Sequence, residues 1–461
     1  MKDVVLLQGQ KQSQVMDFDY ELFVIGAGPG GLAAAERAAG YGVRVAIVEQ
    51  EQVGGTCVVH GCIPEKLMTY AASFSQVFES ADEYGWGKVS REFDWCQFMR
   101  ARDRDINHLS QVHLQKLQKT GVELLKGHAR FLDAHMVEIE GHRYTADKIL
   151  IAVGAKAIKS DVPGMEYAIT VRKMLELDQQ PKHLAIIGSN HIAVKLAGIM
   201  NGLISKVTLI ISEDRILPEC DEELRIAVQE DMTRLGVRIC CNTKVEKIER
   251  IQNCLNLTLS GNSQPVTVET VVSIANRIPN LDGLDLEKAG VEVKQGAIAV
   301  DDYSRTTQAT IFAVGDCTGR PPFTPVAIAA ARAFADTEFG KQPRVVDYEC
   351  VPYLVASNPE AATVGLTEAQ AREKLGEAVR CYRKKFQSLF DMRAESPEKT
   401  LLKLVIDSHS DRVLGAHMVG DCAAEILQMI ALAMKAGVTK TNFDNTIGIH
   451  PSIGEEFFCM R

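Results

Sequence analysis

The sequence predicts a chain of the α/β class that ends in an α+β segment. Two strand–helix–strand units, at residues 20–49 and 183–211, each begin with a short apolar strand followed at once by glycine. Short apolar strands of this kind are typical of parallel sheets that helices cover on both faces. From about residue 345 the pattern changes to valine-rich alternating segments and one apolar helix, 423–436. We therefore expect two similar α/β domains and a third domain of different build.

Composition and charge exclude several classes of protein. A chain of 461 residues is too long for one ordinary core, and its net charge of −9, without a long basic run, argues against nucleic acid or an anionic membrane as main partner. No stretch is apolar enough to span a bilayer, and residues 1–18 lack the pattern of a signal peptide. The twelve cysteines show neither a disulfide framework nor metal-ligand spacing. We therefore expect a cytoplasmic protein without a metal.

The first strand–helix–strand unit carries a dinucleotide fingerprint. Strand 20–25 leads into residues 26–31 (GAGPGG), a helix follows, and a second strand, 44–48, ends at Glu49. Glycines permit the tight turn and let the backbone approach a pyrophosphate at the helix N-terminus, while the acidic residue accepts a ribose hydroxyl. A chance glycine loop is the alternative, but strand, helix, second strand and acid are all in register. The predicted binding residues are Gly26, Gly28, Gly31 and Glu49.

The second strand–helix–strand segment, residues 183–211, repeats this order with a changed fingerprint. Its first strand, 184–188, leads into residues 188–193 (GSNHIA), followed by a helix to about residue 203 and a strand at 207–211. Asn190 stands where the second glycine belongs, so its side chain crowds the path of a pyrophosphate.

Two cysteines five residues apart, Cys57 and Cys62, follow a Gly-Gly-Thr turn, and Pro64 comes just after them. Proline suits the first turn of a helix, and the positive end of a helix lowers the pKa of a nearby thiol. A pair that cycles between disulfide and dithiol is the functional interpretation. Two buried, inert thiols are the alternative.

The stretch 54–66 resembles the redox-active motif GGTCxxxGCxPxK of the FAD-dependent pyridine nucleotide–disulfide oxidoreductases (class I), which include glutathione reductase, dihydrolipoamide dehydrogenase and mercuric reductase. The resemblance runs from about residue 19 to the C-terminus, is closest to glutathione reductase, and includes segments 324–332 and 443–456. It implies two Rossmann-like dinucleotide-binding domains and a dimerisation domain that builds a homodimer. The implied divisions are an N-terminal extension (1–18), an FAD-binding domain (19–155, returning at 281–343), an NAD(P)-binding-like domain (156–280) and an interface domain (344–461).

The resemblance also implies roles for single residues. Cys62 faces the flavin, Cys57 attacks a small-molecule or protein disulfide, and His450, oriented by Glu455, is the acid–base partner of Cys57 across the dimer. The further positions implied to lie at FAD are Gly55, Thr56, Ala129 and Asp316.

Three sets of positions depart from this family pattern, and two of them lie on the substrate side and beside the flavin. On the substrate side, Arg332 and Glu456 match positions that contact glutathione in the family. Two positions differ: His113 aligns with a tyrosine that flanks the disulfide, and Glu36 stands where an arginine binds a glutathione carboxylate. A glutamate there would repel that carboxylate. Beside the flavin, the usual lysine is Glu65 and its usual glutamate partner is Lys195, which indicates either a charge-swapped ion pair or two independent changes.

The nicotinamide-nucleotide site departs most. Ser212 and Pro218 occupy the positions of two arginines that grip the 2′-phosphate of NADPH. His191 replaces a gating tyrosine and Asn276 replaces a turn glycine, while Gly188 is kept. These changes predict weak or absent NAD(P)H binding. The rival interpretations are a flavin disulfide reductase fed by a different donor and a flavin-binding redox sensor without turnover.

Overall fold

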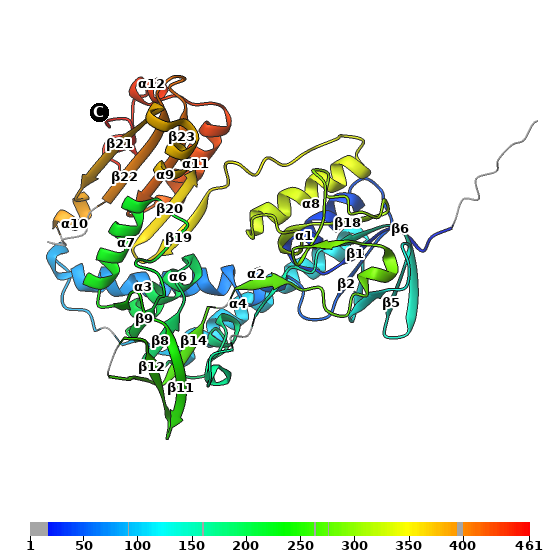
Figure 1. Ribbon diagram of the computed structural model, residues 1–461, viewed down its shortest axis with the longest axis horizontal. Coiled ribbons are helices and arrows are strands. Elements are labelled where there is room, and N and C mark those ends of the chain that lie inside the picture. Colours follow the sequence, from blue (N-terminus) through cyan, green and yellow to red (C-terminus); the bar gives the residue numbers. More distant parts are fainter. Residues whose placement is uncertain (1–16, 91, 159–160, 262–263, 275, 394–399) are drawn as a thin grey trace, which may run out of the picture. The chain divides into compact units, whose positions relative to one another are not determined.

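The computed structural model describes residues 17–461 apart from 91, 159–160, 262–263, 275 and 394–399. The chain divides into two compact units, which are described separately. The first unit contains residues up to Val53, Leu114–Gly154 and Asn280–Val345; the second contains Gly54–His113, Ala155–Pro279 and Val346–Arg461 (Figure 1). Most of the N-terminal extension, residues 1–16, lies outside the described residues.

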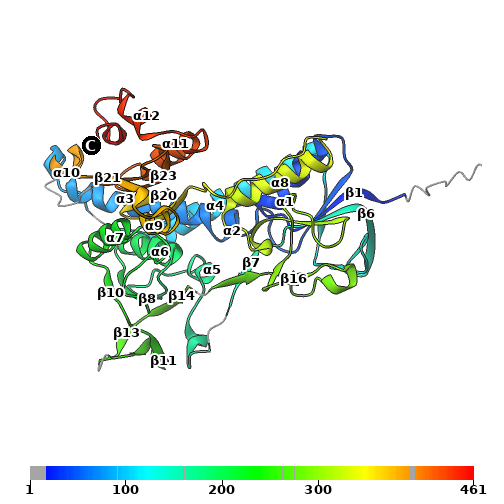
Figure 2. The same ribbon diagram turned by 45° about the horizontal axis from the view of Figure 1, so that its top comes forward.

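The first unit is built on a sheet with five parallel strands in the order β3-β2-β1-β6-β18. The apolar residues of β1 are fully buried, because helices cover such a sheet on both faces. Strands β5 and β4 continue the sheet antiparallel to the first half of β6. Helices α1 and α8 pack against each other (Figure 2). The bounds are β1 Tyr20–Ile25, α1 Pro29–Ala39, β2 Val45–Glu49, β3 Glu123–Lys126, β4 Ala129–Phe131, β5 Met136–Ile139, β6 His142–Ile151, η3 Leu286–Ala289, β16 Val293–Lys294, β17 Ala297–Ile298, β18 Ile311–Ala313, η4 Gly315–Thr318 and α8 Thr324–Glu338.

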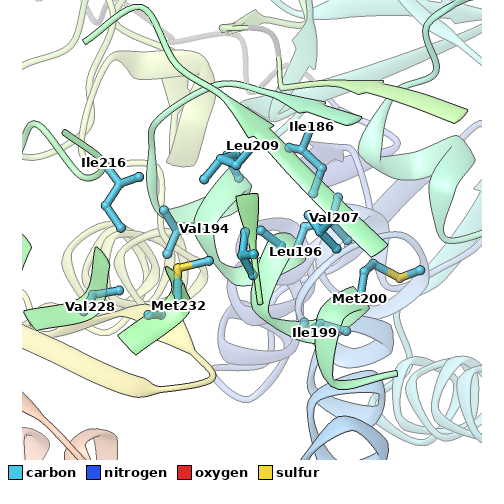
Figure 3. Packing of buried hydrophobic residues seen from close by; sticks show 14 of the residues in the cluster. Ile186, Val194, Leu196, Ile199, Met200, Val207, Leu209, Ile216, Val228 and Met232 are labelled. Atoms are coloured by element: carbon cyan, nitrogen blue, oxygen red, sulfur yellow. The ribbon is translucent and has the colours of Figure 1, made fainter. Parts of the chain in front are cut away.

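The second unit contains a further parallel sheet, in the order β10-β9-β8-β14. Helix α6 packs against β9 and α3, and the buried core of this region is almost wholly aliphatic (Figure 3). The bounds are α2 Gly55–Val59, α3 Cys62–Ser80, η1 Asp82–Tyr84, α4 Trp95–Thr120 (whose last seven residues belong to the first unit), β7 Ala155–Ala157, η2 Met165–Tyr167, α5 Val171–Met174, β8 His183–Ile187, α6 His191–Gly202, β9 Lys206–Ile210, α7 Glu222–Arg234, β10 Arg238–Cys240, β11 Val245–Ile251, β12 Cys254–Leu259, β13 Val266–Val268, β14 Thr270–Ser273 and β15 Arg277–Pro279.

The C-terminal part of the second unit is a five-stranded antiparallel sheet in the order β19-β20-β23-β22-β21, and α11 packs against β20 and β23 (Figure 1). The bounds are β19 Tyr353–Ser357, β20 Glu360–Gly365, α9 Glu368–Leu375, η5 Gly376–Ala378, β21 Val379–Phe386, α10 Leu389–Arg393, β22 Thr400–Asp407, β23 Val413–Val419, α11 Ala423–Lys435, α12 Lys440–Asp444 and η6 Gly454–Phe457.

A buried charge cluster joins α7 to this sheet. The Nζ atom of Lys403, on β22, lies 2.8 Å from Asp221, 2.9 Å from Glu223 and 2.8 Å from Glu368, and its side chain is 2% exposed. Arg383 bridges the same two glutamates at 2.5 Å each. Burial alone would lower the pKa of Lys403, but the three carboxylates outweigh it and raise that pKa. The cluster therefore keeps its charges while it is buried.

The segment from residue 68 to 130 is helical for only part of its length. Helix α3 ends at Ser80 and α4 at Thr120, and Gly121, with a φ of +75°, turns the chain into strands β3 and β4. Pairing of β3 with the buried strand β2 decides the conformation there, which local composition did not indicate.

Candidate functional site

The glycines of the first fingerprint are required by close backbone approaches. Gly26 has a φ of +103°, and a Cβ there would lie 2.6 Å from the carbonyl oxygen of Ala152. A Cβ at Gly31 would lie 1.9 Å from the carbonyl oxygen of Gly26. A larger residue at either position would push the turn away from the sheet. The turn therefore has the tight form that a dinucleotide needs.

The end of helix α1 beside this turn is open to an anion. Its N-cap, Gly28, offers no side chain, and the first turn of the helix contains no acidic residue. Glu49 Oε2 accepts the N–H of Ala27 at 2.8 Å, which holds the carboxylate at the same turn. An uncapped helix N-terminus beside a fixed acid fits the pyrophosphate and ribose of a dinucleotide.

The other predicted residues of the first unit lie at the same edge of its sheet. Asp316 follows β18, as Gly26 follows β1 and Glu49 ends β2, and these strands are parallel. The N–H of Gly127 donates to the carbonyl of Glu49 at 3.0 Å, so the loop leading to Ala129 also meets the end of β2. The first unit thus brings its FAD candidates together, and these residues fit the cofactor.

The two cysteines lie in a tight helix–turn–helix of the second unit. Cys57 is in the short helix α2, whose N-cap Gly54 has a φ of +118°, and Cys62 is the first residue of α3. A Cβ at Gly61 would lie 2.9 Å from the carbonyl oxygen of Thr56, so the turn between the helices requires glycine. Cys62 is therefore at the positive end of a 19-residue helix, where a thiolate is favoured.

The expected ion pair between α3 and α6 is present. Lys195 Nζ lies 2.7 Å from Glu65 Oε1, and the two side chains are 15% and 21% exposed. Its position relative to a flavin stays a prediction.

Near the C-terminus, His450 and Glu455 form a hydrogen-bonded pair. His450 Nδ1 lies 3.0 and 3.1 Å from the two carboxylate oxygens of Glu455. The N–H of Ser452 and the contact with His450 lower the pKa of Glu455, so the carboxylate stays charged. The His450 side chain is 82% exposed, which leaves Nε2 able to exchange protons with another molecule. The neighbouring Glu456 pairs with Lys384.

The second fingerprint differs from the first at its helix terminus. Asn190 is the N-cap of α6, and its Oδ1 accepts the N–H groups of Ile192 (3.1 Å) and Ala193 (3.2 Å). These are the groups that would otherwise face a pyrophosphate. The side chain therefore occupies two N–H donors that a pyrophosphate would need, and its crowding of the phosphate path stays a prediction.

The loop after β9 is acidic. Ser212 and Pro218 are exposed, as expected for positions that could reach a ligand. The cation in this loop, Arg215, lies 3.3 Å from Glu222. Asn276 is also exposed, and its carbonyl accepts the N–H of Ile158 at 3.0 Å. Among the described residues of this loop, Arg215 is the one arginine that could reach a 2′-phosphate, and it is already paired with a carboxylate.

The substrate candidates are distributed over both units. Glu36 Oε2 lies 2.5 Å from Lys116 Nζ, which offsets the negative charge that sequence analysis expected to repel a carboxylate. Arg332 is exposed on α8. His113 is half-buried on α4, and its Nδ1 atom is buried without a hydrogen-bond partner.

Two histidine contacts were not predicted from the sequence. His60, between the two cysteines, lies with Nδ1 3.5 Å from Glu176 Oε1. His191 Nδ1 lies 3.6 Å from Glu219. Burial alone would raise the pKa of Glu219, but the contact with His191 outweighs burial, and the pKa is lowered. The sequence indicated only that a titratable residue, His60, lies inside the cysteine motif. Its contact could not be predicted because Glu176 is far away in the sequence.

The sequence matches known families along most of its length. Residues 20–331 match the family described as "Pyridine nucleotide-disulphide oxidoreductase", and residues 351–460 match its dimerisation domain. Glutathione reductase of Nostoc sp. is 50% identical over 459 residues (97% of this chain, 100% of the relative), and that of Burkholderia cepacia is 41% identical over 445 residues (96% and 99%). The HOCl-induced flavoprotein disulfide reductase RclA from Escherichia coli superposes with a TM-score of 0.87 at 27% identity, covering 96% of this chain and 99% of that one.

Two kinds of feature are absent from the described residues. None of the described helices is long and apolar enough to cross a membrane. Within the same part of the chain, no group of three or more His, Cys, Asp or Glu is arranged to hold a metal ion.

Proposed function

The chain belongs to the pyridine nucleotide–disulfide oxidoreductase family and is an FAD-dependent disulfide reductase, and we propose that Cys57 and Cys62 are the redox pair through which it reduces a disulfide of the glutathione class. The placement of Cys62 as the first residue of α3, with Cys57 five residues earlier on α2, carries this proposal. When bound, FAD supplies the two-electron chemistry. The residues that would hold it are those of the first fingerprint, with Glu49, Ala129 and Asp316, and Gly55 and Thr56 beside the cysteines.

In this proposal each sulfur has one task. Cys62 is the sulfur nearer the flavin, stabilised as a thiolate by the N-terminus of α3. Cys57 attacks the substrate disulfide, a mixed disulfide forms, and the leaving thiol needs a proton. His450, oriented by Glu455, gives that proton from the second subunit of a homodimer, which the match to a dimerisation domain supports.

Glutathione disulfide is the proposed substrate because the chain is similar over nearly its whole length to proteins named glutathione reductase. Arg332 and Glu456 stand at glutathione-contacting positions of that family. The Glu36–Lys116 contact at 2.5 Å places a cation beside the one acidic departure. Because Lys116 offsets the charge of Glu36, a glutathione carboxylate should be repelled less than it would be by Glu36 alone.

The family binds a pyridine nucleotide, but in this chain we propose that NAD(P)H binds weakly. Asn190 Oδ1 takes two N–H donors of α6, and the loop after β9 holds Ser212 and Pro218 in place of a phosphate-binding arginine pair. Each lost charge-assisted contact costs about 1.5–3 kcal/mol, so two of them weaken binding by two orders of magnitude or more. A different donor, or dithiol substrate running in reverse, then reduces the flavin.

Two coarser features, the domain division and the cellular location, complete the proposal. The proposed domains are an FAD-binding domain (19–155 and 281–343), an NAD(P)-binding-like domain (156–280) and an interface domain (344–461). A cytoplasmic location is proposed from the twelve scattered cysteines, whose spacing does not form a disulfide framework.

The test is to mix the oxidised FAD-loaded protein anaerobically with NADPH or NADH and follow the flavin absorbance. Little bleaching at micromolar nucleotide is expected, with full reduction by excess dithiol. Rapid bleaching by either nucleotide contradicts the donor proposal. Failure of the dithiol-reduced protein to reduce glutathione disulfide or any other disulfide contradicts turnover, and favours the non-catalytic redox sensor.

A further inference from the structure

One titratable side chain lies within the redox turn itself. His60 ends α2, and its N–H donates to the carbonyl of Thr56 at 2.9 Å, so the backbone of the turn fixes it between the two cysteines. Its imidazole is 18% exposed, and Nδ1 lies 3.5 Å from Glu176 Oε1, just after α5. His60 therefore lies inside the same tight turn as the cysteines, three residues after Cys57 and two before Cys62.

Glu176 does not need His60 for its own neutralisation. Arg172 Nε lies 3.4 Å and Lys173 Nζ lies 3.5 Å from the Glu176 carboxylate, so two cations already face it. A protonated His60 therefore adds a net positive charge beside the cysteines instead of merely completing an ion pair. Because Arg172 and Lys173 are half-exposed or more, solvent screens them more than it screens His60.

We propose that His60 is a positioning residue for the Cys57–Cys62 pair: its imidazolium, held by Glu176, stabilises the thiolate that reduction of the disulfide creates. The proposal rests on the redox role proposed above for these cysteines. Reduction breaks the S–S bond, adds two electrons, takes up one proton near neutral pH and leaves one thiol and one thiolate. The electrons come from reduced flavin or, in a test, from dithiothreitol, which is oxidised to its cyclic disulfide.

The effect of His60 is tied to pH. Histidine is the side chain whose charge changes between mildly acidic and mildly alkaline pH, so the test compares pH 6.0 with pH 8.5. The charged side chains in the first turns of α3 are Glu65, which pairs with Lys195 on α6, and Lys66, which lies over the Tyr70 ring. Carboxylate, ammonium and guanidinium groups keep their charges between pH 6 and 8.5.

The experiment equilibrates the full, FAD-loaded chain with dithiothreitol redox buffers at pH 6.0 and 8.5, and quantifies the disulfide by acid quenching, alkylation and mass spectrometry. At each pH the variant is compared with the wild type, so the pH dependence of dithiothreitol cancels. In His60→Gln the equilibrium constant for reduction should fall about fivefold at pH 6.0 and be unchanged at pH 8.5. Fivefold corresponds to about 20 mV at 29.6 mV per tenfold.

Two further variants decide between a charge effect and a packing effect. His60→Lys, with a permanent cation, should match the wild type at pH 6.0 and exceed its equilibrium constant at pH 8.5. His409→Gln removes an exposed histidine far from the cysteines in sequence and should change neither value. Equal shifts of His60→Gln at both pH values, or none at either, overturn the inference while leaving the redox pair intact. A wild-type chain that never forms the Cys57–Cys62 disulfide overturns the proposed function, and the inference with it.

Discussion

Lys195 Nζ lies 2.7 Å from Glu65 Oε1, and this contact ties the helix of the second dinucleotide fold to the first turn of the helix that starts at Cys62. The sequence predicted this pair because both charges are reversed relative to the family. Since the two side chains are mostly buried, their attraction is screened less than that of a surface pair.

The first prediction concerns this pair. Glu65→Lys and Lys195→Glu should each destabilise the chain, because each places like charges close together, and the double variant should recover most of the loss. A coupling of at least about 1 kcal/mol is expected from urea unfolding of the four proteins. Additive effects would mean that the contact contributes little.

The second prediction concerns the cysteines. Cys57→Ser should keep a long-wavelength charge-transfer absorbance from the Cys62 thiolate to the flavin, because Cys62 is the sulfur proposed to face the flavin, and should lose disulfide turnover. Cys62→Ser should lose both. Absorbance spectra after dithiol reduction and a turnover assay with glutathione disulfide check the two variants. If Cys57→Ser loses the band and Cys62→Ser keeps it, the roles of the two sulfurs are reversed.

The third prediction concerns nucleotide binding. Asn190→Gly removes a cap at a cost of a few tenths of a kcal/mol and frees the N–H groups of Ile192 and Ala193. Combined with Ser212→Arg and Pro218→Arg, it should strengthen NADPH binding by about two orders of magnitude, measured as the nucleotide concentration that half-bleaches the flavin. The two arginine changes without Asn190→Gly are the matched control and should give a smaller gain. An unchanged half-bleaching concentration would rule out these positions as the reason for weak binding.

The fourth prediction concerns stability in acid. His417 is fully buried; its Nδ1 lies 2.6 Å from Thr363 Oγ1 and its Nε2 3.2 Å from the carbonyl of Leu366. Burial lowers its pKa to about 4, below its value in the unfolded chain, so the unfolded chain binds the extra proton first as the pH falls. Stability is therefore full above about pH 6.5 and declines toward pH 4, by about 2 kcal/mol between pH 8 and pH 5.

Urea unfolding of the wild type and of His417→Gln between pH 8 and pH 5 measures this decline. The variant is less stable throughout, but its stability should fall less with pH because it cannot take up that proton. Parallel curves for the two proteins would assign the acid sensitivity to other groups.

The sequence predicted the features that depend on neighbouring residues. Strand Tyr20–Ile25, strand His183–Ile187 and the helix from Ala423 are local patterns of burial, and the structure confirms them. The crowding at Asn190 was also predicted, but its capping of α6 was not, since a cap depends on where the helix begins.

Contacts between distant parts of the chain could not be predicted. Lys403 reads as one polar residue in an apolar strand, and its partner Asp221 lies 182 residues away. His60 and Glu176 are likewise far apart, and only the fold brings an exposed carboxylate to the cysteine turn. The Glu65–Lys195 pair was found only because a family pattern linked the two positions.

The cluster around Lys403 has a consequence for anyone who exchanges parts between related proteins. Its carboxylates Asp221 and Glu223 begin α7, whereas Lys403, Arg383 and Glu368 belong to the C-terminal sheet and its helix. A chimera joined between residues 280 and 344 that takes only one side from a relative must supply the missing charges, because an unpaired buried lysine costs about 3–5 kcal/mol. The start of α7 and strands β21 and β22 therefore have to be transplanted together.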